Sequence, residues 1–203
     1  VFALLPGSRQ SELHFMADTF IETAKRLNQR FPQARFLVPL ATRETRDMFD
    51  LALYRLSAQE LPITRLFGHA HDAMGVADGV LVASGTATLE AALLKKPMVI
   101  AYRMSPWSWR LMRRMKYQSW VGLPNILAGH FVVPEFLQDD ATPDNLAQAL
   151  GNLVEDQETC RRIESAFTLL HEQLRQNSSV RAAEAIVQYL NRKDVWTSAP
   201  QAV

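Results

Sequence analysis

Five short, largely apolar runs recur along the chain, and they constrain its fold more than any other feature. They lie at residues 2–5, 36–40, 63–67, 80–83 and 98–102. Their hydrophobicity is continuous rather than alternating, which is typical of parallel strands buried on both faces. Amphipathic stretches separate them, so strands and helices alternate. The sequence therefore predicts an α/β fold, with a Rossmann-like, doubly wound parallel sheet flanked by helices.

The predicted helices fall into two groups. Between the strands, one helix places Leu13, Met16, Phe20, Ala24 and Leu27 on a single face, and two others cover residues 45–56 and 88–95. After a loop-rich stretch, three more are predicted over residues 143–154, 158–174 and 179–190. We expect a Rossmann-like domain over residues 1–140, C-terminal helices over 141–192 that pack on it or cross to another domain, and a tail over 193–203.

Composition narrows the class of protein. With 203 residues, of which 48% are hydrophobic, the chain can bury a substantial core. A single cysteine, Cys160, predicts neither a disulfide nor a metal cluster. No apolar run approaches the roughly 20 residues of a membrane span, and no leader pattern opens the chain. Because the chain opens directly on an apolar strand without Met, we expect it to start at a boundary between domains.

Two loops that each join a strand to a helix are candidate anion sites. In Pro6-Gly7-Ser8-Arg9, the glycine permits close backbone approach, N–H groups at the helix start attract an anion, and Arg9 could contact a phosphate with two nitrogens. A plain turn capped by Ser8 or Ser11 is the alternative. The loop over residues 84–88 offers the same arrangement after another strand. Two such loops in one sheet indicate a ligand with a diphosphate.

Glu90 follows the second loop and has no local structural role in the sequence. Its neighbours at three and four residues are not basic, and its spacing misses the capping box. A carboxylate one helical turn from a bound phosphate lies about 5 Å along the axis, within reach of ribose hydroxyls. The absence of G-x-G-x-x-G from the sequence counts against NAD.

Three motifs in order, "LLPGSRQSEL", "VASGTATLEAALLKKPMVIAYR" and "GLPNILAG", give the chain a family resemblance from Val1 to about Leu190. It resembles the carboxyl-terminal half of lipid-A-disaccharide synthases, which are glycosyltransferases with two Rossmann domains (GT-B). The resemblance implies transfer of diacylglucosamine from UDP to diacylglucosamine 1-phosphate, with release of UDP. It implies no cofactor and no metal, only a UDP-sugar donor substrate. The general base would lie in the missing amino-terminal domain, so this chain alone would catalyse nothing.

The resemblance also implies a set of site residues. Those expected to contact UDP are Gly7, Ser8, Arg9, Phe67, Gly68, Ser84, Gly85, Thr86, Thr88 and Glu90. The glycine-containing loop before Glu90 would meet the diphosphate, Glu90 the ribose, and Phe67 with Gly68 the uracil. Arg9 and Asn125 are the candidate catalytic residues. For Asn125 the alternative is that it ties down its own loop, since an amide in apolar surroundings must find partners.

A basic, aromatic segment lies in a stretch from residue 91 to 134 that holds no Asp or Glu. Its candidate membrane or lipid contacts are Trp107, Trp109, Arg110, Arg113, Arg114 and Lys116. Aromatic rings and cations suit an anionic membrane surface, and packing against another domain is the alternative. Nucleic acid is not expected, because no binding motif is present. We therefore expect a cytoplasmic protein, peripheral to the cytoplasmic face of the bacterial inner membrane.

Other functions share parts of this sequence pattern. A GT-B N-acetylglucosaminyl transferase or a UDP-N-acetylglucosamine 2-epimerase would have the same loop followed by a glutamate, without the first and third motifs. A non-catalytic nucleotide- or lipid-binding module is the alternative from another class. The last helix could also pair with a second copy of the chain, which would make a homodimer.

Overall fold

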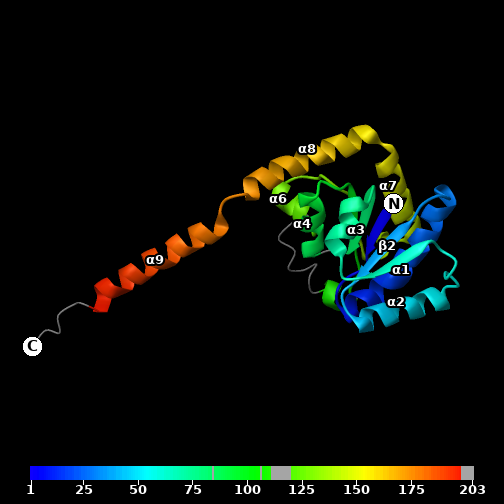
Figure 1. Ribbon diagram of the computed structural model, residues 1–203, viewed down its shortest axis with the longest axis horizontal. Helices are drawn as coiled ribbons and strands as arrows, with labels where there is room; N and C mark the ends of the chain where they lie inside the picture. The colour runs from blue at the N-terminus through cyan, green and yellow to red at the C-terminus, as the bar shows by residue number, and fades with distance from the viewer. Residues whose placement is uncertain (84, 106, 111–119, 198–203) are drawn as a thin grey trace, which may run out of the picture. The chain divides into compact units, whose positions relative to one another are not determined.

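The fold is built on one parallel sheet of six strands. The computed structural model describes residues 1–83, 85–105, 107–110 and 120–197 (Figure 1). The strands are β1 (Phe2–Leu5), β2 (Phe36–Leu40), β3 (Ile63–Phe67), β4 (Gly79–Ala83), β5 (Met98–Tyr102) and β6 (Glu135–Leu137). Their order is β3-β2-β1-β4-β5-β6, and every neighbouring pair is parallel. The predicted fold class is confirmed.

Helices cover both faces of the sheet. On one face lie α1 (Gln10–Arg30), α2 (Arg43–Arg55) and α7 (Pro143–Glu155), with α1 in contact with the other two. The other face carries α3 (Ala70–Val76), α4 (Thr86–Leu93) and α6 (Leu123–Ala128). Figure 1 shows β2 between α1 and α3. A short 3-10 turn, η1 (Gln138–Asp140), and the helices α8 (Gln157–Leu174) and α9 (Ser178–Thr197) complete the described elements.

Burial explains why these segments form these elements. Every residue of β1 and β4 is buried, as expected for central strands covered on both faces. On α1, the predicted face from Leu13 to Leu27 is at most 1% exposed. Burying a large apolar side chain contributes about 1.5–3 kcal/mol, so this face alone attaches α1 firmly to the sheet.

The short elements β6 and α6 were not predicted from the sequence. The strand β6 has only three residues, and it lies where the sequence indicated a loop. It forms because β5 offers an unpaired edge, with Ile100 aligned on Glu135 and Tyr102 on Leu137. The helix α6 has six residues and starts with Pro124 in its first turn. Both are too short to give a periodic signal.

The chain divides into two compact units, Val1–Leu170 and His171–Val203. The first unit contains the whole sheet, α7 and most of α8, which contributes Ile163, Phe167 and Leu170 to the core. The expected division at residue 140 and the crossing of the last helices to another domain stay predictions. Among the described residues, no helix combines the length and the apolar character needed to cross a membrane.

Candidate functional site

A cleft of about 540 Å³ opens at the carboxyl edge of the sheet. Leu5, Leu40, Ala83 and Tyr102, the last residues of β1, β2, β4 and β5, line it. Since β1 and β4 are neighbours, the chain's winding direction reverses between them. Open α/β sheets bind ligands at this kind of switch point, because the loops after the two strands diverge and leave a crevice. This cleft is therefore the candidate functional site.

The cleft brings together most of the predicted nucleotide-contact residues. Those that line it are Gly7, Ser8, Arg9, Gly68, Gly85, Thr86 and Glu90. Ser84 lies outside the described residues. Phe67, Thr88 and Asn125 do not line the cleft; Phe67 is 62% exposed, whereas Thr88 and Asn125 are fully buried. A direct contact with ligand is therefore supported by geometry for the first group only.

The loop before α4 presents bare backbone to the cleft. Gly85 has a φ of +149°, and no atom lies within 4 Å of the position that a Cβ would occupy. Among the described residues, no side chain caps α4. The hydroxyl of Thr88 donates to the Gly85 carbonyl over 2.7 Å. Thr88 therefore contacts the loop from the protein side, and its contact with a ligand stays a prediction. The N–H groups at the start of α4 can bind an anion.

The loop before α1 differs from the sequence-based expectation. The N–H groups of Ser8 and Arg9 donate to Oε2 of Glu12 over 2.8 and 3.2 Å. The Arg9 Nη1 donates to Oε1 of the same carboxylate over 3.1 Å. The N–H groups that the sequence assigned to a phosphate are thus occupied by Glu12, a residue of the same helix. The Arg9 side chain, which is 78% exposed, remains available to a ligand.

Asn125 lies at the centre of a buried hydrogen-bond network. Its Oδ1 accepts from the N–H groups of Val132 and Val133, and its Nδ2 donates to the Val133 carbonyl and to Glu135 Oε1. All of its hydrogen-bonding capacity is used within the protein. These contacts favour the alternative that Asn125 ties down its own loop. Its catalytic role stays a prediction.

Sequence reasoning missed several residues of this region. Glu135 accepts from the N–H groups of Val121 and Gly122 over 2.8 and 2.9 Å, and Val121 lines the cleft. Tyr102 could have been found, because it ends a predicted strand. Glu12 could also have been found, because it lies three residues after Arg9, the spacing of a capping box. Glu135 gave no such signal, since β6 itself was not predicted.

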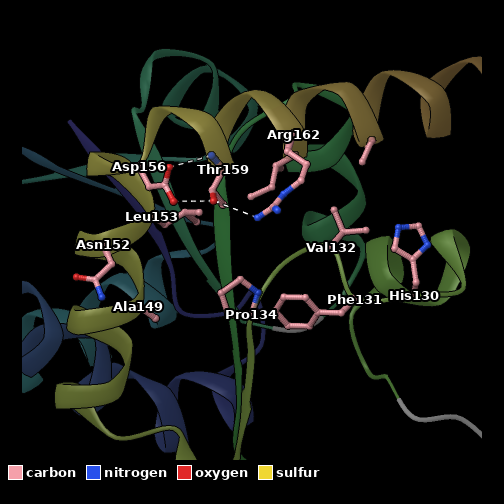
Figure 2. Close-up of a pocket in the computed structure, with 12 residues that line it drawn as sticks. His130, Phe131, Val132, Pro134, Ala149, Asn152, Leu153, Asp156, Thr159 and Arg162 are labelled. Carbon is pink, nitrogen blue, oxygen red and sulfur yellow. Dashed lines mark hydrogen bonds between the residues drawn. The ribbon is translucent and has the colours of Figure 1, made fainter.

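A second cavity, of about 510 Å³, lies apart from the cleft (Figure 2). It is bounded by α7, α8 and the loop from His130 to Pro134, at the amino end of β6. Figure 2 shows Asp156 linked to Thr159, and Thr159 to Arg162. The Thr159 N–H, donating to Asp156, lowers the pKa of that carboxyl below its ordinary 3.8. This cavity shares no lining residue with the cleft.

The basic, aromatic segment is described only in part. Trp107 is 82% exposed, and Arg110 is exposed as well. Trp109 is half-buried. Arg113, Arg114 and Lys116 lie outside the described residues. Among the residues that the structure describes, no three His, Cys, Asp or Glu side chains are grouped so as to hold a metal ion.

Cys160 has the structural role expected for a lone helical cysteine. It is half-buried, and its Sγ donates to the Leu153 carbonyl over 3.1 Å. Burial raises the pKa of its thiol above the ordinary value. This favours the protonated form, which is the unreactive one.

Solved structures of low sequence identity share this fold. The S. aureus MnaA–UDP co-structure matches 94% of this chain and 45% of its own, with a TM-score of 0.59 and 16% identity. The calicheamicin glycosyltransferase CalG4 matches 98% of this chain and 43% of its own, with a TM-score of 0.54 and 17% identity. At these identities the likeness shows the fold alone, a Rossmann-like domain as found in GT-B enzymes.

Sequence relatives are much closer. The lipid-A-disaccharide synthase of Dechloromonas aromatica (strain RCB) is 60% identical over 192 residues, which are 94% of this chain and 50% of that protein. That of Aromatoleum aromaticum is 58% identical over 201 residues, 99% of this chain and 51% of that protein. The chain thus spans about half the length of these curated relatives. A family model described as lipid-A-disaccharide synthetase matches residues 1–190, and the chain therefore belongs to the lipid-A-disaccharide synthetase family.

Proposed function

We propose that this chain is the donor-nucleotide-binding half of a lipid-A-disaccharide synthase. The whole enzyme would move diacylglucosamine from UDP-diacylglucosamine to diacylglucosamine 1-phosphate and release UDP. The observation that carries the proposal is the cleft, in which Gly85, Arg9 and Glu90 meet at the switch point of the sheet. A solved structure of the same fold was determined with UDP, which supports a nucleotide ligand here.

Each part of the cleft has a role in this proposal. The N–H groups at the start of α4 bind the diphosphate, and the Glu90 carboxylate accepts hydrogen bonds from two ribose hydroxyls. Glu90 is exposed and lines the cleft from the same helix. Gly68, which follows β3, leaves room for the uracil of the nucleotide. The ligand thus lies along one edge of the sheet, from β3 to β4.

The chemical step would depend on stabilising the leaving group. The bond between the anomeric carbon and the β-phosphate oxygen breaks, and its electron pair goes to UDP. The acceptor's 6-hydroxyl oxygen bonds to that carbon from the opposite side, and its proton goes to a base in the other half. Arg9 and the α4 N-terminus stabilise the charge that develops on UDP. They supply positive potential without a metal ion.

Isothermal titration tests the assignment of Glu90. Glu90→Gln should weaken UDP binding. A carboxylate has two acceptor oxygens, one for each ribose hydroxyl, whereas an amide has only one, and its hydrogen bonds lack the charge. The unchanged protein should bind UDP more tightly than 2′-deoxy-UDP. Equal affinities for these two ligands would refute the ribose contact, and undetectable UDP binding would refute the function.

We also propose that the basic, aromatic segment binds an anionic membrane surface, at the cytoplasmic face of the bacterial inner membrane. The exposed Trp107 and Arg110 support this, together with the basic residues that follow them in the sequence. Liposomes of anionic and of zwitterionic lipid provide the test. The protein should sediment with anionic vesicles at low salt and be released at high salt. If the protein does not sediment at low salt, the membrane proposal is refuted, and packing against another domain becomes the explanation for this segment.

A further inference from the structure

The N-terminus of α1 contains a carboxylate where an anion-binding loop would leave space for a ligand. Glu12 accepts three hydrogen bonds from two residues: the N–H groups of Ser8 and Arg9, and the Arg9 guanidinium. The loop after β4 has no such occupant among the described residues. The two sides of the cleft therefore differ: at α1 a carboxylate accepts the N–H groups of Ser8 and Arg9 and contacts an exposed arginine, whereas the first turn of α4 presents backbone N–H groups.

The backbone at Gly7 is shaped around Glu12. Gly7 has a φ of +126°, and a Cβ there would lie 2.5 Å from the Glu12 Cβ and 2.7 Å from its Oε2. Only glycine tolerates both this conformation and this approach. The Glu12 side chain is 17% exposed, whereas that of Arg9 is 78% exposed. Glu12 thus lies beneath the loop, and the guanidinium extends from it into the cleft.

From this arrangement we infer that Glu12 is a positioning residue for Arg9, which it holds ready for the diphosphate of the donor nucleotide. The inference rests on the proposed function. A guanidinium has five N–H donors in a fixed plane. With Nη1 on Glu12, the donors of Nη2 and Nε remain for phosphate oxygens. A long, exposed arginine otherwise loses much rotamer freedom when it binds, and a preformed contact reduces that loss.

The charge of Glu12 determines in which direction UDP affinity changes when this residue is replaced. A carboxylate near a diphosphate repels it, so a Glu12 without a positioning role would weaken nucleotide binding. Glu12→Gln would then tighten the binding of UDP. If Glu12 positions Arg9, the same substitution weakens binding, because the amide no longer forms a charge-assisted bond to the guanidinium. The two cases predict opposite changes in the same measurement.

Titration calorimetry on the full chain with UDP and with uridine is the test. We expect Glu12→Gln to weaken UDP binding about tenfold, the loss of one charge-assisted contact, and to leave uridine binding unchanged. Arg9→Ala should also weaken UDP but not uridine. The double variant should bind UDP no worse than Arg9→Ala alone, because Glu12 acts through Arg9. Glu158→Gln, which removes a first-turn carboxylate from α8, is the matched control and should change neither affinity.

The inference would be overturned by tighter or unchanged UDP binding of Glu12→Gln, by a parallel loss of uridine binding, or by fully additive losses in the double variant. Arg9→Lys provides a second test if Glu12→Gln does not fold. A lysine cannot contact Glu12 and phosphate through a planar fork, so it should bind UDP as weakly as Arg9→Ala; retained affinity would contradict the inference. If the unchanged chain binds UDP and only these tests fail, the proposed function stands. If it binds no UDP, both fail.

Discussion

At the scale of single residues, Gly7 and Gly85, two of the three cleft glycines with positive φ, differ in what surrounds them. Gly7 makes room for Glu12, whereas the Cβ position of Gly85 faces open space. We expect Gly85→Ala to lower the free energy of unfolding by about 1–2 kcal/mol through backbone strain alone. Gly7→Ala should cost more, because a steric overlap is added. Urea denaturation of both variants measures the difference, and an equal or reversed order would contradict this explanation.

Asn125 permits a second residue-scale prediction. Asn125→Ala would leave the N–H groups of Val132 and Val133 without their acceptor, so we expect a loss of about 2–4 kcal/mol in unfolding free energy. Asn145→Ala is the control, because its exposed amide makes a single hydrogen bond, to the Asp140 carbonyl, within the part of the chain that the structure describes. It should cost well under half as much. Similar losses in urea denaturation would show that the buried network does not stabilise the loop.

At the scale of elements, a chain of charges links α1 to α7. Glu22 accepts from Lys25 over 2.7 Å and from Arg26 over 3.1 Å, and Arg26 also donates to Asp144 at the start of α7 over 2.5 Å. The hydrogen bond from Lys25, and then that from Arg26, lowers the pKa of Glu22 below its ordinary 4.5. The ionised form of Glu22 therefore stabilises the folded state.

The sign of this shift predicts a pH dependence. Because the folded pKa is the lower one, the stabilisation is complete above pH 4.5 and is lost as the pH falls through the lowered value. Glu22→Gln should be about 0.5–1 kcal/mol less stable at pH 7, as is typical of partly exposed pairs. The difference should shrink below pH 4.5. Urea denaturation at a series of pH values checks this, and a gap that widens in acid would reverse the assignment.

Elements with a long, regular pattern could be predicted from the sequence, and short ones could not. The face from Leu13 to Leu27 repeats over four turns, and it predicted α1 correctly. In contrast, β6 has three half-buried residues, and its pairing with β5 is a tertiary contact. The sequence pattern therefore gave no sign that Glu135 accepts hydrogen bonds from the segment beside the cleft.

At the scale of the whole molecule, the strand order decides which loops meet. The loop after β1 and the loop after β4 lie more than 70 residues apart in sequence, yet the pairing of β1 with β4 makes them neighbours. The sequence analysis predicted that both loops contact one ligand, because each joins a strand to a helix and can bind an anion. The capping-box spacing of Arg9 and Glu12 was the one sign in the sequence that Glu12 occupies the first loop, and the outcome also depends on the backbone conformation at Gly7.

The arrangement of the cleft predicts that this chain binds the nucleotide without transferring the sugar. Of the cleft's two glutamates, Glu12 is engaged by three donors and Glu90 is assigned to the ribose. We therefore expect the full chain to bind UDP but to release none from UDP-diacylglucosamine in the presence of diacylglucosamine 1-phosphate. A coupled assay for UDP measures this, with the longer Dechloromonas aromatica relative as the positive control. Turnover by this chain above the buffer blank would place the general base within it, and Glu90→Gln and Glu12→Gln would then show which carboxylate removes the proton.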